Sequence, residues 1–292
     1  MRILATTLFA LALFAGPAVA QLEISSPGQQ AIPLALTRFL PLEEDVRPEI
    51  AAEINEVLEG DLGFSGLFDL VDPEAFLSDA DKIGLLSIDV NFSQWRLLGA
   101  EALVKGAYSV RGDQLVIEAR LFDVNRSRLS NGRRYVGRLK DLRRIAHAFA
   151  DQILKALTGF EGPFNSRISY VSNRTGNKEI YIMDSDGYND TRITDHQSIA
   201  LNPDFSPDGR ELIFTSYQRG NPDLFRKVLA SGTENLLSNR NGLNVTARHR
   251  PGGDEMALTL SRDGNTEIYL LDRNGKIEDR LTRSWGIDIN PS

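Results

Sequence analysis

The sequence predicts an α/β domain over residues 21–163, followed by an incomplete all-β propeller of about three blades over residues 164–292. Three observations lead to this fold class. From Arg167 onward the same landmarks recur at a spacing of about 44 residues. Before Pro163 the apolar residues instead follow a helical period. The chain has no cysteine, so both parts must be held together by ordinary packed cores.

Residues 1–20 have the pattern of a cleaved Sec-type signal peptide. A positive charge at Arg2 precedes the apolar run Ile3 to Phe14, and Ala18-Val19-Ala20 offers small residues for cleavage before Gln21. The apolar run is shorter than the roughly 20 residues that span a bilayer, which disfavours the alternative of a membrane anchor. We therefore expect a protein of the periplasm of a Gram-negative bacterium, without direct membrane insertion.

Two amphipathic helices are expected in the α/β domain. The first begins at Pro48, has four apolar residues on one face and is expected to end at Gly60. The second runs from Leu142 to Leu157 and is expected to stop at Thr158-Gly159. The segment Gly63-Phe64-Ser65-Gly66 is one residue short of a nucleophile elbow and is expected to be an ordinary loop before Leu67 to Val71.

Strands are expected between the two helices. Residues Ala102 to Val110 and Gln114 to Val124 form a hairpin that turns near Arg111-Gly112-Asp113, and Arg133 to Leu139 adds a further strand. Gly162-Pro163 is the expected junction with the second part of the chain.

The propeller is predicted from four short strand patterns per repeat, which is the content of one blade. Ile168 to Ser172 aligns with Leu212 to Ser216 and with Met256 to Ser261. Turn glycines keep the same spacing, as in Pro207-Asp208-Gly209. The Asp184 to Gly187 run is interpreted as a hairpin turn and not as a calcium loop, because it lacks the further ligands of an EF-hand.

The strand order predicts that the ring of blades is open. The repeat starts at Arg167 with a second-strand pattern, so the first blade should lack its inner strand. The last residues fall in the inner-strand phase of another blade, from which we expect a C-terminally truncated chain. Such a chain should be prone to aggregation through its exposed strand edges.

Composition and motifs argue against catalysis and against nucleic-acid binding. The net charge is −7, which is the wrong sign for a phosphate-rich partner. His147, His196 and His249 are widely separated, and no nucleophile elbow or zinc motif is present. We expect no catalytic residue, cofactor or metal. His147 is expected to be a packed, hydrogen-bonded histidine, and Trp95 to lie in the core of the first domain.

The loops that join one blade to the next are the predicted protein-binding surface, because in a propeller they gather around the channel on one face. These loops are Asp195 to Leu201, Asn239 to Asn244 and Arg283 to Asn290. The candidate binding residues within them are His196, Gln197, Asn239, Arg240, Asn241, Arg283 and Trp285.

Several segments together resemble the TolB family, the periplasmic propeller proteins of the Tol-Pal system. They are Ile32 to Leu36, Ala102 to Gly106, the run from Ala146-His147 to Leu157-Thr158-Gly159, and the blade motif Phe205 to Gly209 with Leu212 to Ser216. The blade motif alone occurs in many bacterial propellers. Its combination with the preceding domain is specific, although residues Ala247 to Gly253 depart from the family's usual junction.

The resemblance implies a six-bladed propeller with no enzymatic activity, monomeric when complete. It implies that the channel face binds the lipoprotein Pal, and that an extended N-terminal segment binds the C-terminal domain of TolA. The matching residues are Gln21, Leu22, Glu23 and Ile24 at the start of Gln21 to Gln30. Other envelope proteins are further possible partners. The implied role is outer-membrane integrity and envelope constriction during cell division.

Two other functions stay open at the level of the sequence. One is an exported hydrolase whose propeller precedes a catalytic domain that this chain lacks. That function would require a nucleophile elbow in the remainder of the gene. The other is a ligand-sensing propeller without protein partners, which would not need the segment Gln21 to Gln30.

Overall fold

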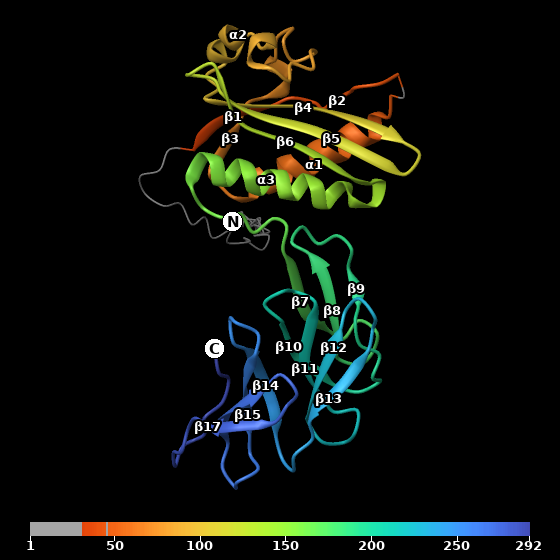
Figure 1. Cartoon of the computed structure of the whole chain (residues 1–292), viewed down its shortest axis with the longest axis vertical. Helices are drawn as coiled ribbons and strands as arrows, with labels where there is room; N and C mark the ends of the chain where they lie inside the picture. The colour runs from red at the N-terminus through yellow and green to blue at the C-terminus, as the bar shows by residue number, and fades with distance from the viewer. Residues whose placement is uncertain (1–30, 45) are drawn as a thin grey trace, which may run out of the picture.

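The computed structural model describes residues 31–44 and 46–292, and it contains an α/β domain followed by three antiparallel sheets (Figure 1). Helices α1 and α3 lie on the side of the first sheet that faces the later sheets, and α2 lies on the opposite side (Figure 1). The predicted combination of an α/β domain and a partial propeller is confirmed. Within the described residues, no helix is both long and apolar enough to cross a membrane.

The sheet of the α/β domain has the strand order β3-β1-β4-β5-β6, and β2 pairs with β4. β1 runs parallel to β3 and β4, whereas β4, β5 and β6 form antiparallel pairs. The expected hairpin is thus confirmed, and β6 begins earlier than the sequence predicts. The strands are β1 (Ile32–Leu36), β2 (Leu40–Pro41), β3 (Phe68–Leu70), β4 (Ala102–Arg111), β5 (Gln114–Asp123) and β6 (Arg128–Arg138).

Helix α1 (Pro48–Phe64) begins with a proline in its first turn, as predicted, but it does not end at Gly60. The helix continues because its apolar face continues: Leu62 is fully buried in the core against the sheet. Burying a leucine is worth about 2 kcal/mol, which exceeds the roughly 1 kcal/mol that a glycine costs inside a helix. The predicted boundary was therefore wrong by one turn.

Helix α3 (Leu142–Thr158) has the predicted limits, and Gly159 ends it with a left-handed φ of 82°. Helix α2 (Phe92–Leu97) belongs to a second core on the other face of the sheet, where Trp95 is 1% exposed. The Trp95 indole donates to Asp79 Oδ2 at 2.7 Å, and Asp79 also pairs with the buried Lys105 at 3.1 Å. Short 3₁₀ helices are η1 (Pro73–Ala75), η2 (Ser87–Asp89) and η3 (Leu139–Asp141).

The second part of the chain forms one three-stranded and two four-stranded sheets, each in simple meander order. The predicted absence of an inner strand from the first blade is confirmed within the described residues, because β7 directly follows the linker. The strands are β7 (Arg167–Ser172), β8 (Glu179–Asp184), β9 (Thr191–Arg192), β10 (Ala200–Phe205), β11 (Glu211–Ser216), β12 (Asp223–Val228), β13 (Glu234–Ser238), β14 (Asn244–His249), β15 (Glu255–Leu260), β16 (Glu267–Asp272) and β17 (Ile277–Arg280).

Adjacent blades pack face to face through small apolar cores. Ile180 of the first blade meets Leu212 and Phe214 of the second, and Ile213 of the second meets Leu258 of the third. This is the packing expected of successive propeller blades, in which each sheet buries its faces against its neighbours.

Candidate partner-binding loops and domain junction

The first inter-blade loop is held by a buried carboxylate at the start of the third strand of its blade. Glu179, the first residue of β8, is 1% exposed. Its Oε1 accepts the backbone N–H groups of His196 at 2.9 Å and Gln197 at 3.0 Å, and its Oε2 accepts the hydroxyl of Thr194. The carboxylate therefore fixes the start of an exposed loop from within the blade.

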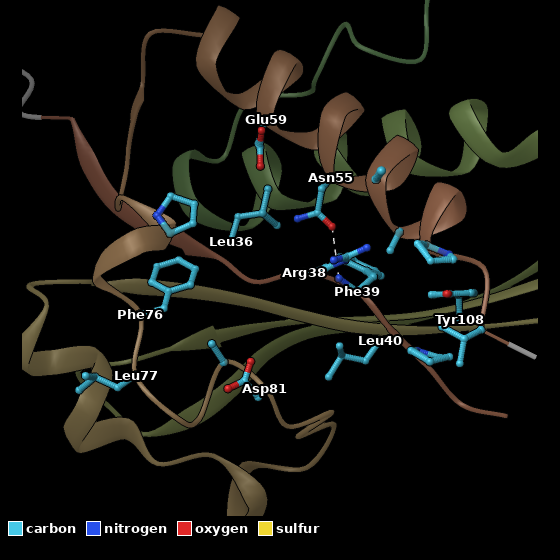
Figure 2. A pocket seen from close by; sticks show the side chains of 17 residues that line it. Leu36, Arg38, Phe39, Leu40, Asn55, Glu59, Phe76, Leu77, Asp81 and Tyr108 are labelled. Carbon is cyan, nitrogen blue, oxygen red and sulfur yellow. Dashed lines mark hydrogen bonds between the residues drawn. The ribbon is translucent and has the colours of Figure 1, made fainter. Parts of the chain in front are cut away.

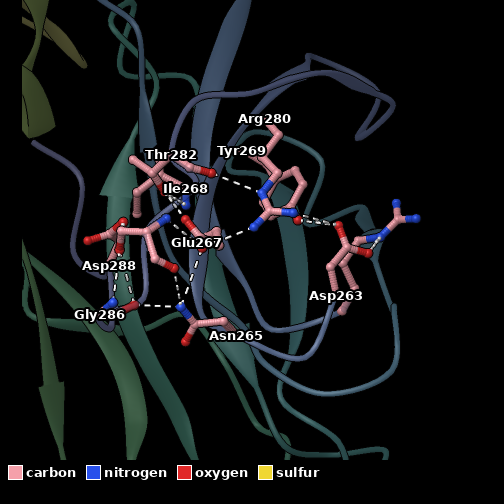
Figure 3. A network of polar contacts seen from close by, with 11 residues as sticks. Asp263, Asn265, Glu267, Ile268, Tyr269, Arg280, Thr282, Gly286 and Asp288 are labelled. Carbon is pink, nitrogen blue, oxygen red and sulfur yellow. Dashed lines mark hydrogen bonds and ion pairs between the residues drawn. The ribbon is translucent and has the colours of Figure 1, made fainter.

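The same arrangement recurs in the third blade, as Figure 3 shows. Glu267, fully buried at the start of β16, accepts the Thr282 hydroxyl at 2.6 Å and the Ser284 N–H at 3.1 Å. Arg280 pairs with the same carboxylate at 3.0 Å. The hydrogen bond donated by Thr282, with those from Ser284 and Arg280, lowers the pKa of Glu267 below its ordinary 4.5. The carboxylate thus stays ionised beneath its loop.

The second blade has the shorter acid Asp223 at this position, and Asn244 holds the loop backbone instead. Asp223 accepts a hydrogen bond from the Asn221 side chain at 2.7 Å and, among the described residues, none from the loop, because an aspartate is one methylene shorter than a glutamate. The loop N–H of Arg240 is bound instead by Asn244 Oδ1 at 3.1 Å. The acids at the start of the third strand recur at the 44-residue period, and that phase was the sequence signal for them.

Five of the seven predicted binding residues in the inter-blade loops are exposed. Gln197, Asn239, Asn241 and Arg283 are exposed, and Trp285 is exposed over its whole surface, at 106%. The backbone of Gln197 is held at a φ of 51°, in the left-handed region. Four polar side chains and one aromatic side chain are thus exposed on three loops whose backbones are hydrogen-bonded to their blades.

Two of the predicted binding residues, Arg240 and His196, instead make contacts within and between the blades. The guanidinium of Arg240 donates to Ser238 Oγ at 2.7 Å and to the backbone oxygen of Gly275 in the next blade at 3.0 Å. The His196 side chain is only 8% exposed and packs against Phe214 and Phe225. The other predicted residues, Gln21, Leu22, Glu23 and Ile24, lie outside the described residues.

His196 also connects a serine to a carboxylate, in the order found in hydrolase triads. Its Nδ1 lies 2.7 Å from Ser216 Oγ, and its Nε2 lies 3.0 Å from Glu234 Oε1. Ser216 is fully buried, so no substrate can reach its hydroxyl. A nucleophile must be able to contact the reacting carbon, and this relay therefore reads as a structural connection between strands β11 and β13.

Each inner-strand segment contains a left-handed residue at the same phase. Asn202, Thr246 and Asn290 have φ values of 53°, 55° and 56°. In the second and third blades this residue lies within a register shift between the inner strand and its neighbour, between Leu201 and Asp204 and between Val245 and Arg248. Such bulges change the direction of side chains along a strand, here on the strands next to the predicted loops.

A separate groove of about 720 Å³ lies in the α/β domain, between α1, the β1–β2 segment and residues 73–81 (Figure 2). Asn55 forms one wall, but its amide is bound to the backbone of Thr37 and Phe39 at 3.1 and 3.2 Å. The charged groups that line the groove are Arg38, Glu59 and Asp81. Burial raises the pKa of Glu59 above its ordinary 4.5.

The junction between the two domains is built around His147, which is 2% exposed in α3. Its Nδ1 lies 2.7 Å from Asp61 Oδ2 in α1, and its Nε2 lies 3.1 Å from Asp186 Oδ2 in the β8–β9 turn. The prediction of a packed, hydrogen-bonded histidine is confirmed. Sequence reasoning missed the partners, since Asp186 was interpreted only as part of a hairpin turn.

Arg143 completes the junction one helical turn before His147. Its guanidinium donates to Asp186 Oδ2 at 2.5 Å and stacks on the Tyr188 ring at 3.4 Å. The Tyr188 hydroxyl in turn donates to Glu56 of α1 at 3.2 Å. A mainly apolar cavity of about 630 Å³ lies beside these residues, with the exposed Phe64 on its wall.

Comparison with known proteins shows which family has this architecture. A family model described as the TolB amino-terminal domain matches residues 20–129, and one described as the TolB beta propeller domain matches residues 154–292. The chain belongs to the TolB family. Among the described residues of this family member, no group of three or more His, Cys, Asp or Glu side chains is placed to hold a metal ion.

Individual relatives agree with the family models. The Tol-Pal system protein TolB of Syntrophotalea carbinolica is 55% identical over 214 residues, which are 73% of this chain and 50% of that protein. That of Desulfosudis oleivorans is 39% identical over 90% of this chain and 60% of its own length. The crystal structure of TolB from Acinetobacter baumannii superposes with a TM-score of 0.74 at 25% identity, over 89% of this chain and 62% of that one. The chain thus spans about half to three fifths of the length of these relatives.

Proposed function

We propose that this chain acts in the periplasm as a non-catalytic adaptor of the Tol-Pal system. Its blade loops bind the lipoprotein Pal, and Gln21 to Gln30 bind the C-terminal domain of TolA. Two relatives bear the name Tol-Pal system protein TolB, which supports membership of that system. Through these partners the protein links the two membranes of the envelope, maintaining outer-membrane integrity and envelope constriction at division.

The observation that carries the proposal is the anchoring of exposed loops on buried acids. Glu179 accepts two backbone N–H groups, and Glu267 one, from the loop that follows their blade. A loop already held in one conformation loses little entropy when a partner binds, so the same contacts give higher affinity. Exposed amide, guanidinium and indole side chains are typical of a polar protein interface with an aromatic anchor.

No observation favours the hydrolase. The serine–histidine–carboxylate order at Ser216 and His196 is present, but Ser216 is fully buried. An adaptor function needs exposed surface, and the loops between these blades present exposed side chains, as at Gln197 and Trp285.

The proposal is tested by calorimetric titration of the chain that begins at Gln21 with the periplasmic domain of Pal. The double substitution Gln197→Ala with Asn241→Ala should weaken Pal binding about tenfold, which corresponds to about 1.4 kcal/mol. The control is Ser231→Ala, on an exposed turn in another part of the second blade. Unchanged affinity in the loop variant would exclude these loops as the Pal surface.

TolA binding is tested separately by deletion of Gln21 to Gln30. The deletion should abolish binding of the TolA C-terminal domain and leave Pal binding intact. Loss of both partners would show that the segment does not act as a separate binding element. Retention of TolA binding would assign TolA to another surface.

A further inference from the structure

The contacts of His147 require more protons than a neutral histidine supplies. Its two ring nitrogens face carboxylate oxygens of Asp61 and Asp186, at 2.7 and 3.1 Å. A neutral imidazole has one N–H group, and its other nitrogen would face an ionised carboxylate with a lone pair. Both contacts are favourable only if one further proton is present, either on the ring or on Asp61.

The surroundings favour that proton because acids outnumber bases. The charged and titratable groups around His147 come from α1 and α3 and from the β8–β9 turn. They are Glu53, Glu56, Asp61, Arg143, Asp151, Asp186 and Tyr188. Burial opposes the charged form of His147, but the hydrogen bond to Asp61 and the charges of Asp61 and Asp186 outweigh it, so the pKa of His147 lies above 6.5. Burial also raises the pKa of Asp61 above 3.8.

The cluster joins two bodies that are otherwise connected by a short linker. The linker is fixed to the α/β domain, since Asp151 of α3 accepts the N–H groups of Phe164 at 2.9 Å and Asn165 at 3.2 Å. On the propeller side, the side-chain contacts of Asp186 and Tyr188 reach α1 and α3. The β8–β9 turn is therefore the point at which the first blade is held against the helices.

We propose that one proton in addition to the N–H of the neutral His147 ring, carried by the ring or by Asp61, latches the α/β domain to the first blade through Asp186, and that its loss frees the two domains to move about the linker. The latch is closed when the proton is bound. When the proton leaves, one imidazole nitrogen and a carboxylate oxygen repel each other at the junction. The contacts that still hold the turn are those of Arg143 with Asp186 and the Tyr188 ring, and that of Tyr188 with Glu56.

The direction of the pH effect follows from the raised pKa of His147. A histidine whose pKa is higher in the closed state contributes its full stabilisation below the ordinary pKa of 6.5. The contribution is lost as the pH rises through the higher, closed-state pKa. Asp186 works in the opposite sense, because its pKa is held below 3.8 by Arg143 and His147 despite burial. The latch is therefore closed in mildly acidic solution and opens on the alkaline side.

The variant Asp61→Asn distinguishes the effect of the additional proton from the effect of side-chain packing on the latch. An asparagine side chain has nearly the same shape, and its amide N–H can donate to Nδ1 of a neutral His147. The ring then keeps its single N–H for Asp186. This variant should stay latched without the additional proton, whereas Asp186→Ala should be unlatched at every pH.

The experiment measures the distance between spin labels on the two domains. The chain has no cysteine, so the exposed positions Ser130 and Asn235 can each be changed to cysteine and labelled in the full chain. Distance distributions are recorded from about pH 6 to about pH 9, a range that brackets a histidine pKa raised above 6.5. The control is Asp190→Ala, which removes a carboxylate of the same blade that pairs only with Arg174 and Tyr170.

The unsubstituted chain and the Asp190→Ala variant should show one narrow distribution at low pH that broadens as the pH rises. Asp61→Asn should stay narrow throughout, and Asp186→Ala should be broad throughout. A distribution of the labelled unsubstituted chain that does not change with pH would overturn the proposal. So would an Asp61→Asn variant that broadens at the same pH as the unsubstituted chain.

Discussion

Glu179 and Gln197 are joined across the boundary between a buried strand and an exposed loop. The Glu179 carboxylate, 1% exposed, accepts the Gln197 N–H at 3.0 Å while it accepts the His196 N–H at 2.9 Å. Hydrogen bonds to an ionised acceptor are about twice as strong as neutral ones. The conformation of a candidate binding loop is therefore decided by a residue that no partner can touch.

Substitution Glu179→Ala should lower the free energy of unfolding by about 3 kcal/mol, because two loop N–H groups and the Thr194 hydroxyl lose their acceptor. Urea denaturation measures the change. The control is Glu278→Ala, which breaks only an exposed ion pair with Lys276 and should stay within about 0.5 kcal/mol. An equal effect of the two substitutions would show that the buried acid does not anchor the loop.

The loop of the third blade should loosen in acid. The pKa of Glu267 is lowered by the hydrogen bonds that it accepts, so its contribution is complete above its ordinary pKa of 4.5. That contribution is lost as the pH falls through the lowered pKa. Hydrogen exchange should show the Ser284 N–H losing protection over this range, after correction for the intrinsic exchange rate. In Glu267→Gln the loss should be much less dependent on pH.

Two glycines of the α/β domain should respond to alanine in opposite directions. Gly60 lies inside α1, and an added Cβ there meets no atom within 4 Å. Gly60→Ala should therefore raise the free energy of unfolding by about 0.5–1 kcal/mol. At Gly162 an added Cβ would lie 2.8 Å from the Asp151 Cα, so Gly162→Ala should lower the same free energy by about 1–3 kcal/mol. Thermal melts of both variants check the signs, and a stabilising Gly162→Ala would contradict this geometry.

The sequence predicted what repeats and missed what is made by single long-range contacts. Successive blades show the same strand phase, so the order and approximate positions of the strands from β7 to β17 could be predicted from the spacing, whereas the register shifts within the sheets could not. His147 and Asp186 are 39 residues apart in different domains, and no local pattern connects them. The parallel pairing of β1 with β3 could not be predicted either, because only three residues of each strand are paired and so short a segment has no clear periodicity. His196 was placed on an exposed loop, since the sequence cannot show that a ring turns inward between Phe214 and Phe225.

The inner strands carry a backbone strain that differs between repeats. The left-handed position is occupied by asparagine at Asn202 and Asn290 but by threonine at Thr246, with a φ of 55°. Asparagine tolerates this region, whereas a β-branched residue is a true outlier there, at a cost of about 1–2 kcal/mol. The cost of this backbone conformation at Thr246 is partly offset by a hydrogen bond, because the Thr246 hydroxyl lies 2.9 Å from the Thr259 hydroxyl.

Substitution Thr246→Asn should relieve the strain but lose a hydrogen bond worth about 1 kcal/mol, so the single variant should be close to neutral. The two effects separate in a Thr259→Val background, which removes the partner hydroxyl and keeps the side-chain shape. In that background Thr246→Asn should raise the free energy of unfolding by about 1 kcal/mol in urea denaturation. A loss of stability in the Thr259→Val background would mean that the left-handed backbone at this position is not strained by threonine. In that case the side-chain packing around Thr246 would have to maintain the bulge. Asparagine, which the other repeats have at this position, would then not raise the free energy of unfolding.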